Sequence, residues 1–202
     1  MGYRFVKRAF DLAFSSVVIV VGFVPGLVLS GFVVKDTGGS PIYAQERIGK
    51  DGRPFRIYKF RTMVADADDV EKHLTAEQLE EWKRERKVDD DPRITRLGGF
   101  LRRTSLDELP QFLNVLAGQM SVVGPRPITR DELAHFGEDA AKLLSCRPGI
   151  TGFWQCGLRN GATFESGERQ RIELGYVDAA GPAADARIIF STLDTMVRKT
   201  GR

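Results

Sequence analysis

Two neighbouring carboxylates near the middle of the chain are of a type that reacts with charged substrates. Asp107 and Glu108 follow two arginines, Arg102 and Arg103, and precede Pro110. A carboxylate can act as a nucleophile or as a base, and arginine side chains can balance the charge of an anionic substrate. The pattern therefore predicts a reactive carboxylate pair beside an anion-binding site.

The same segment also matches a helix capping box, which is the structural alternative. Ser105 and Glu108 have the spacing of such a box, and an acidic residue in a first helical turn suits the helix dipole. Pro110 weakens this alternative because it restricts Leu109. A capping box also leaves the arginines on both flanks unexplained, so we favour the chemical interpretation.

Three further cationic side chains have a context suited to phosphate. Arg126 lies between Pro125 and Pro127, which restrict the backbone on both sides and hold the guanidinium in one direction. Such an arginine suits bidentate capture of phosphate, although a rigid turn with an incidental arginine explains the pattern equally well. Lys59 and Arg61 are two residues apart on a predicted strand, so we expect both to meet the same anion.

Two later segments have the composition of ligand-binding loops. One runs from Arg147 to Gly152 and includes Gly149, and the other is the pair Arg159 and Asn160. Glycine has no side chain, so it lets the backbone approach a ligand closely. We expect both segments to border the site.

Composition limits the function classes. The 202 residues carry a formal net charge of only +3, which argues against a general polyanion binder and predicts no nucleic-acid partner. Cys146 and Cys156 are predicted to be unpaired, and His73 is far from His135, so no Cys/His metal site is evident. The Asp-x-Asp pattern within 89–91 is a weak metal signal, and a solvated turn is the favoured interpretation.

The N-terminal region contains an uncharged apolar run. Leu12–Val34 holds 23 residues without a charge, and about 20 residues suffice to cross a bilayer as a helix. Arg4, Lys7 and Arg8 predict a cytoplasmic N-terminus by the positive-inside rule. Pro25 interrupts helical hydrogen bonding, so a broken, re-entrant helix that returns to the same side is the alternative to a spanning helix.

The rest of the chain predicts an α+β fold that is mostly helical. A hairpin is expected over 40–63, with strands Pro41–Ile48 and Pro54–Phe60 around a turn at Gly49–Gly52. The last predicted helix carries an apolar stripe, which is typical of core packing, with an interfacial helix on the bilayer as the alternative. The composition predicts helices near 65–87, 107–117, 130–145, 165–178 and 184–199.

Five segments taken together are specific enough to indicate a family. In chain order they are Tyr58–Met63, Asp91–Thr95, Leu101–Gln111, Val123–Pro127 and Arg147–Gly152. They resemble the bacterial sugar transferase family, whose members are monotopic polyprenyl-phosphate phosphoglycosyltransferases, and the resemblance covers nearly the entire chain. Because no large extension precedes the apolar run, the chain resembles the small form of this family.

The resemblance implies transfer of a sugar phosphate from a UDP-sugar to undecaprenyl phosphate, with release of UMP, at the start of glycoconjugate synthesis. It implies a membrane-anchoring re-entrant helix over 1–35 and a catalytic domain over 36–202, on the cytoplasmic face of the bacterial inner membrane. Asp107 would be the nucleophile, forming a covalent intermediate, and a Mg²⁺ ligand. Glu108 would assist the acceptor or position the metal. The substrate-binding residues implied are Lys59, Arg61, Arg102, Arg103, Arg126, Arg147, Arg159, Asn160 and Glu173.

Some positions depart from the family pattern, and they concern sugar recognition more than the core reaction. Val24 stands before Pro25 where serine is frequent, Gln119 replaces an acid, and Glu173 replaces an aspartate. Two other readings stay open: single-step transfer without a covalent intermediate, and a non-catalytic scaffold that binds anionic membrane lipids. The sugar is not specified by the sequence, and a homodimer is left open.

Overall fold

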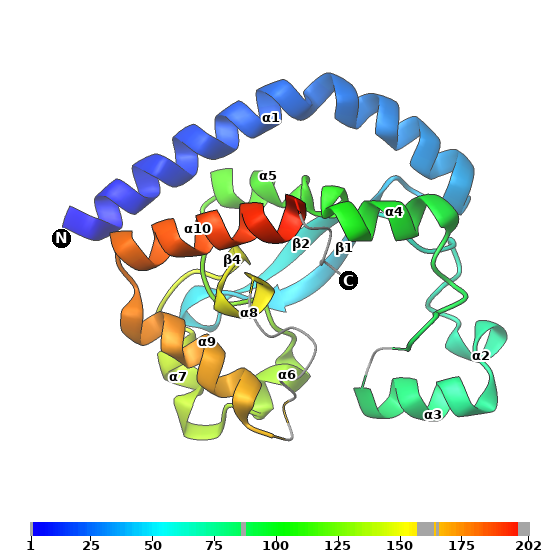
Figure 1. Ribbon diagram of the computed structural model, residues 1–202. Coiled ribbons are helices and arrows are strands. Elements are labelled where there is room, and N and C mark those ends of the chain that lie inside the picture. Colours follow the sequence, from blue (N-terminus) through cyan, green and yellow to red (C-terminus); the bar gives the residue numbers. More distant parts are fainter. Residues whose placement is uncertain (1, 86–87, 157–163, 165, 198–202) are drawn as a thin grey trace.

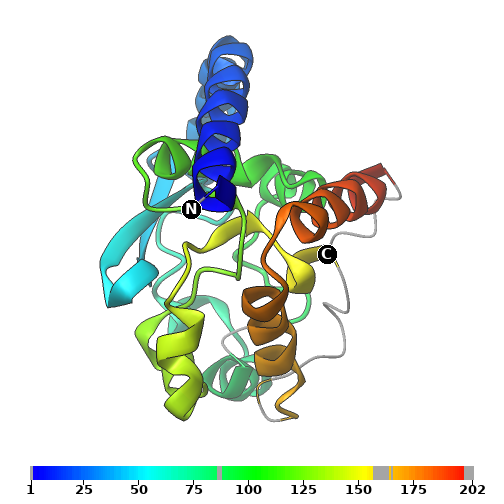
Figure 2. The same ribbon diagram turned by 90° about the vertical axis from the view of Figure 1, so that its left-hand side faces the viewer.

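One long apolar helix arches over a body of short helices and two small sheets. The computed structural model describes residues 2–85, 88–156, 164 and 166–197. Figure 1 shows α1 (Gly2–Thr37) above the body, and Figure 2 looks along it, with the hairpin on one side and α10 (Pro182–Val197) on the other. This architecture confirms the predicted α+β class with mostly helical content.

The predicted hairpin is confirmed. β1 (Ile42–Ile48) pairs antiparallel with β2 (Pro54–Phe60) around the short 3-10 turn η1 (Lys50–Gly52). The elements that match predicted helical regions are α2 (Val70–His73), α3 (Ala76–Glu85), η2 (Leu106–Glu108), α5 (Gln111–Leu116), α6 (Arg130–Ala134), η3 (Gly137–Asp139), α7 (Ala140–Leu143), α9 (Glu168–Ala179) and α10. Four elements were not predicted: α4 (Arg96–Thr104), the parallel strands β3 (Ser121–Val123) and β4 (Gly149–Thr151), and α8 (Phe153–Cys156).

Local side-chain and backbone preferences break two of the predicted helices. The helix expected over 65–87 divides at Thr75, whose hydroxyl accepts a hydrogen bond from the Gln78 backbone at 3.3 Å and so starts α3. The helix expected over 130–145 divides at Gly137, which has a φ of +50°. Both positions favour a new helix start over continuation.

Helix α1 passes through Pro25 without interruption, so the expected break is a bend. Proline removes one backbone donor and crowds the carbonyl of Val21, which bends a helix whose remaining hydrogen bonds persist. By length and composition, α1 is long and apolar enough to cross a membrane. It ends at Thr37, two residues beyond the expected boundary.

Both ends of α1 are attached to the body, while its middle is exposed. Near the N-terminus, Lys7 Nζ lies 2.7 Å from the Asp185 carboxylate of α10, to which the Tyr3 hydroxyl donates at 2.9 Å. Near the other end, Val33 is fully buried in a cluster with Phe60 and Leu101. The exposed apolar residues between these attachments are Val17, Val20, Val21, Phe23, Val24, Leu27 and Val28.

A buried carboxylate makes the most specific of the α1 contacts. Asp11 is 2% exposed, and its Oδ1 accepts hydrogen bonds from the Ser121 hydroxyl at 3.0 Å and the Val122 backbone at 2.9 Å. On the same side of the body, Arg8 donates to the carbonyls of Val115 and Leu116 at the end of α5. The charged start of α1 is therefore bonded directly to β3 and α5.

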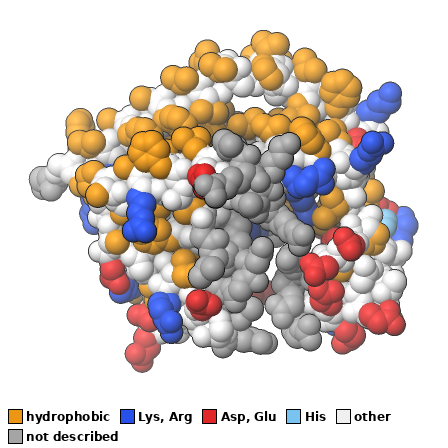
Figure 3. Space-filling view, in the orientation of Figure 1, with side chains coloured by type: hydrophobic (Ala, Val, Ile, Leu, Met, Phe, Trp, Pro, Cys, Tyr) orange, Lys and Arg blue, Asp and Glu red, His pale blue; other side chains and the backbone are white. Residues whose placement is uncertain are grey.

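Helix α10 packs into the core, as predicted, and also exposes apolar side chains; its position on a bilayer stays a prediction. Ile188 is buried in the main core with Tyr176, whereas Phe190 and Leu193 are 71% and 54% exposed. Figure 3 shows that apolar side chains gather on the side of the molecule that carries α1. The exposed Phe100 and Leu113 add to the apolar surface of the body.

Removing the Asp11 carboxylate should release α1 from the body. Asp11→Ala leaves the Val122 N–H without its acceptor, and we expect a loss of roughly 2–3 kcal/mol, the scale for a buried bond to a charged group. The measurement is thermal or denaturant unfolding in detergent. Asp36→Ala, at an exposed site on the same helix, is the control and should change stability little. Equal effects of both substitutions would contradict the assigned role of Asp11.

Candidate functional site

The turn between α4 and α5 places the carboxylate pair. Helix α4 is capped by Thr95, whose hydroxyl accepts from the Gly98 backbone at 2.9 Å, and it ends at Ser105 in a left-handed conformation with a φ of 56°. The turn η2 that follows directs Asp107 inward, where it is 8% exposed. Ser105 makes no side-chain capping bond, so the capping-box alternative is wrong. A capping box does occur at Thr129.

The environment of the pair raises the pKa of Asp107. Burial raises the pKa of Asp107 to about 6, Lys59 opposes this shift, and the neighbouring Glu108 adds to it. Glu108 forms an ion pair with Lys59 of β2, with Nζ and Oε1 2.7 Å apart. The two carboxylates therefore differ: Glu108 is paired, while Asp107 is held near the point of ionisation at physiological pH.

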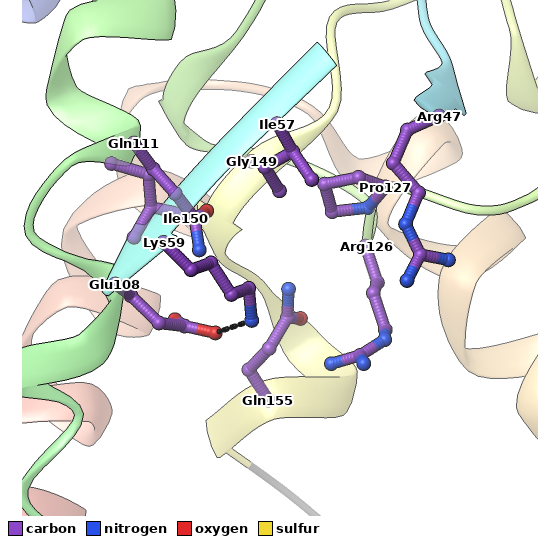
Figure 4. A pocket seen from close by; sticks show the side chains of 10 residues that line it. All are labelled: Arg47, Ile57, Lys59, Glu108, Gln111, Arg126, Pro127, Gly149, Ile150 and Gln155. Atoms are coloured by element: carbon purple, nitrogen blue, oxygen red, sulfur yellow. Dashed lines mark hydrogen bonds and ion pairs between the residues drawn. The ribbon is translucent and has the colours of Figure 1, made fainter. Parts of the chain in front are cut away.

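A pocket opens in front of Glu108. Lys59 and Glu108 lie on one side of it, Arg126 and Arg47 on the other, and Gln155 lies between them (Figure 4). The remaining lining residues are Ile57, Gln111, Pro127, Gly149 and Ile150. The structure thus brings the predicted Lys59, Glu108 and Arg126 together around one pocket, whose lining does not include Asp107. The sequence analysis did not single out Arg47 or Gln155.

Close contact between two chain segments positions Arg126. The backbone N–H of Gly124 donates to Thr151 at 2.9 Å, and that of Gly149 donates to Pro125 at 2.7 Å. A Cβ at Gly149 would lie 2.1 Å from the Gly124 nitrogen, so no side chain fits there. These glycines permit chain-to-chain contact, whereas the sequence had suggested approach to a ligand.

One buried and one half-buried carboxylate hold the arginine side of the pocket. Glu173 is 1% exposed and accepts from the Arg126 backbone at 3.0 Å, and burial raises its pKa to about 7. Glu132 accepts from Arg47 at 3.0 Å and from Arg169 at 3.1 Å. Glu173, predicted to bind substrate, thus lies behind Arg126 and outside the pocket lining.

An aromatic ring joins two of the cations. The guanidinium carbons of Arg126 and Arg169 each lie 4.9 Å from the centroid of the Trp154 ring. Cation–π contacts of this kind limit side-chain movement without neutralising the charge. The indole therefore fixes Arg126 while leaving its charge available to a ligand.

Several predicted residues lie away from the pocket. Arg61 follows the end of β2 and donates to Ser40, so it does not share an anion with Lys59. Arg147 donates to the Gly118 carbonyl at 2.7 Å. Arg103 is exposed on α4 and is absent from the pocket lining. The predicted Arg159 and Asn160 fall outside the described residues.

Arg102 acts on Asp107 through its charge, whereas Asp91 is paired with Arg93. Arg102 donates to the Thr62 hydroxyl at 2.9 Å, and its charge attracts that of Asp107. The solvated turn predicted for 89–91 is confirmed at Asp89 and Asp90, which are exposed, but it is wrong for Asp91, which is buried in an ion pair with Arg93 at 2.6 Å. Among the described residues, no group of three or more His, Cys, Asp and Glu side chains forms a metal cage.

A comparison with known families fits this geometry. A family model described as bacterial sugar transferase matches residues 2–199. The chain belongs to the bacterial sugar transferase family.

Relatives within this family differ in length. The UDP-galactose-lipid carrier transferase of Erwinia amylovora is 41% identical over 201 residues, which is 98% of this chain and 42% of the relative. The undecaprenyl-phosphate galactose phosphotransferase of Salmonella typhimurium is 40% identical, with the same coverage of 98% and 42%. The exopolysaccharide production protein ExoY of Rhizobium meliloti is 39% identical over 96% of this chain and 87% of the relative. The chain therefore spans less than half of the first two proteins.

Burial of Asp107 should make stability depend on pH. A carboxyl group whose pKa is raised on folding, here from 3.8 to about 6, stabilises the fold below the lower value and loses that contribution as pH rises through the higher one. Asp107→Asn should therefore gain roughly 2–3 kcal/mol over the parent between pH 4 and pH 7. Unfolding curves at several pH values test this. Asp68→Asn, at an exposed site, should show no such gain.

Proposed function

We propose that this chain transfers a sugar phosphate from a UDP-sugar to undecaprenyl phosphate by way of a covalent Asp107 intermediate. The observation that carries the proposal is a single pocket in which Glu108 and Lys59 face Arg47 and Arg126. Asp107 is not in the pocket lining; it is buried directly beside Glu108 in the same turn. The names of the Erwinia and Salmonella relatives, with UDP-galactose and undecaprenyl phosphate, support the two substrates. The apolar surface of the molecule suits a lipid acceptor.

In the first half-reaction, a carboxylate oxygen of Asp107 forms a bond to the phosphorus that carries the sugar. The bond from that phosphorus to the bridging oxygen breaks, and UMP leaves with the electron pair. In the second half-reaction, an oxygen of undecaprenyl phosphate attacks the same phosphorus and releases the Asp107 carboxylate. Two steps at one site allow a water-soluble donor and a lipid acceptor to bind in turn.

The cations reduce the charge repulsion that opposes the attack. A carboxylate and a diphosphate are both negative, so positive groups must surround the phosphorus in the transition state. Lys59 supplies one charge beside Glu108, and Arg126 supplies another across the pocket. Glu108 is placed to assist the acceptor phosphate.

The carboxylate pair also fits a magnesium ion. Mg²⁺ is held in many enzymes by one or two carboxylates together with substrate phosphates, so a cage of protein ligands is not required. Asp107 is the predicted ligand, with Glu108 as a second oxygen donor beside it. When bound, the ion would neutralise phosphate charge and polarise the phosphorus.

We also propose that α1 is re-entrant and that the body lies on the cytoplasmic face of the bacterial inner membrane. Lys7 and Asp11 near one end and Val33 near the other all contact the same body. A helix that crossed the bilayer would place its two ends on opposite sides, so the contact of both ends with one body supports the re-entrant alternative. Cytoplasmic placement is supported by the basic N-terminal residues and by a nucleotide-sugar donor.

The covalent step is testable by intact-protein mass spectrometry. Incubation with Mg²⁺ and a panel of UDP-sugars should add one sugar phosphate to the parent chain and release UMP before any lipid is added. Asp107→Asn should lower adduct formation by roughly a thousandfold or more, as loss of a nucleophile does. UMP release that requires undecaprenyl phosphate would indicate single-step transfer. No UMP with any donor would favour a lipid-binding scaffold.

The topology is testable by labelling single cysteines. Cys146 and Cys156 are first replaced by serine. A cysteine introduced at Gly2 then reports the position of the N-terminal end of α1, and one at Arg53 reports the position of the body that follows its C-terminal end. Both positions should react with an impermeant maleimide in inverted vesicles and resist it in intact spheroplasts. Labelling of the two positions from opposite faces would exclude the re-entrant geometry.

A further inference from the structure

The pocket has two cationic ends, and only one of them contains Glu108. At one end Lys59 contacts Glu108 at 2.7 Å. At the other end Arg47 and Arg126 point into the same space, and Gln155 lies between the two ends (Figure 4). In the proposed mechanism Lys59 and Arg126 offset charge at the reacting phosphorus, which leaves Arg47 without a role and the space between Arg47 and Arg126 without an assigned ligand.

Arg47 is held firmly in its position. Its Nη1 donates to Glu132 at 3.0 Å and its Nη2 donates to Gln45 at 2.6 Å. Its side chain is 15% exposed, so it faces the pocket through a small opening. A guanidinium already fixed in this way loses little conformational freedom when it binds an anion.

Positive charge exceeds negative charge at this end. Arg47, Arg126 and Arg169 are gathered around Glu132, while Glu173 has a pKa near 7 and carries only part of its charge at neutral pH. Burial lowers the pKa of Arg47, Glu132 opposes that shift, and Arg126 adds to it by repulsion. An anion bound between Arg47 and Arg126 would relieve this repulsion.

We propose that Arg47 and Arg126 form the subsite for the phosphate of the nucleotide that leaves in the first half-reaction. The inference rests on the proposed function, in which the attacked phosphorus lies beside Asp107. The second phosphate of the donor then extends away from Asp107, toward the arginine end. Gln155 supports a ligand site between the ends, because it is 5% exposed and its Oε1 has no hydrogen-bond partner among the described residues.

This assignment separates the two half-reactions. The subsite is filled while the donor is bound and while UMP departs, and it is empty when the lipid phosphate attacks the intermediate. Arg47 should therefore affect donor binding and UMP binding but not transfer to the lipid. Lys59, at the reacting phosphorus, should affect both half-reactions.

The test uses the full chain in detergent and three measurements on Arg47→Gln. We expect the KM for the UDP-sugar and the Kd for UMP, measured by calorimetry, each to rise about tenfold or more, the scale for one charge-assisted bond. The adduct, formed at saturating donor and freed of nucleotide, should pass its sugar phosphate to undecaprenyl phosphate at the parent rate. Arg47→Lys should recover part of the UMP affinity, and the exposed Arg53→Gln should match the parent.

The outcomes separate this subsite from the proposed function. Unchanged UMP affinity in Arg47→Gln would overturn the subsite, and so would an equal loss of both half-reactions. Retention of the second half-reaction also shows that the variant is folded. A parent chain that releases no UMP from any UDP-sugar would contradict the proposed function, and the UMP binding measurement would still decide the subsite.

Discussion

The contact between a buried carboxylate of α1 and the start of β3 connects the long apolar helix to the arginine side of the pocket. Asp11 accepts from Ser121 and Val122, and β3 pairs with β4 along its other edge. The chain that leaves β3 carries Arg126, and the chain that leaves β4 carries Gln155. A few hydrogen bonds therefore connect the position of the apolar helix to that of the pocket, as the proposed transfer from a water-soluble donor to a lipid acceptor would require.

Burial of charge is used in opposite ways at the two ends of the pocket. Asp107 is buried with its charge only partly compensated, so its carboxyl group is destabilised as an anion, which fits the nucleophile proposed for it. Glu132 and Glu173 are committed to hydrogen bonds with backbone and arginine donors, so they hold Arg47 and Arg126 in place. Burial of the Asp107 carboxylate lowers the stability of the fold, whereas the bonds to Glu132 and Glu173 make the arginine side of the pocket rigid. Such a loss of stability is common at active sites.

The sequence was informative where local rules decide the structure. Strand alternation and the neighbouring prolines located Lys59 and Arg126, but the end of β2 turns Arg61 toward another segment, which no local rule specifies. Helix α4 was missed because Gly98 and Gly99 lower helix propensity in its middle, and the three-residue strands β3 and β4 are too short for a periodic signal. The pairing register that brings Arg47 to the pocket face depends on the folded hairpin.

That hairpin fixes the spacing of the two charges that face each other across the pocket. Arg47 lies opposite Phe55, and Lys59 is four residues further along the same face of β2. At about 3.4 Å per residue, their backbones are about 14 Å apart. The interval is set by strand geometry and by the pairing register of the hairpin, and no loop lies between the two positions on the sheet. Loss of one residue between Phe55 and Lys59 would turn the lysine to the opposite face of the sheet and remove its charge from the pocket.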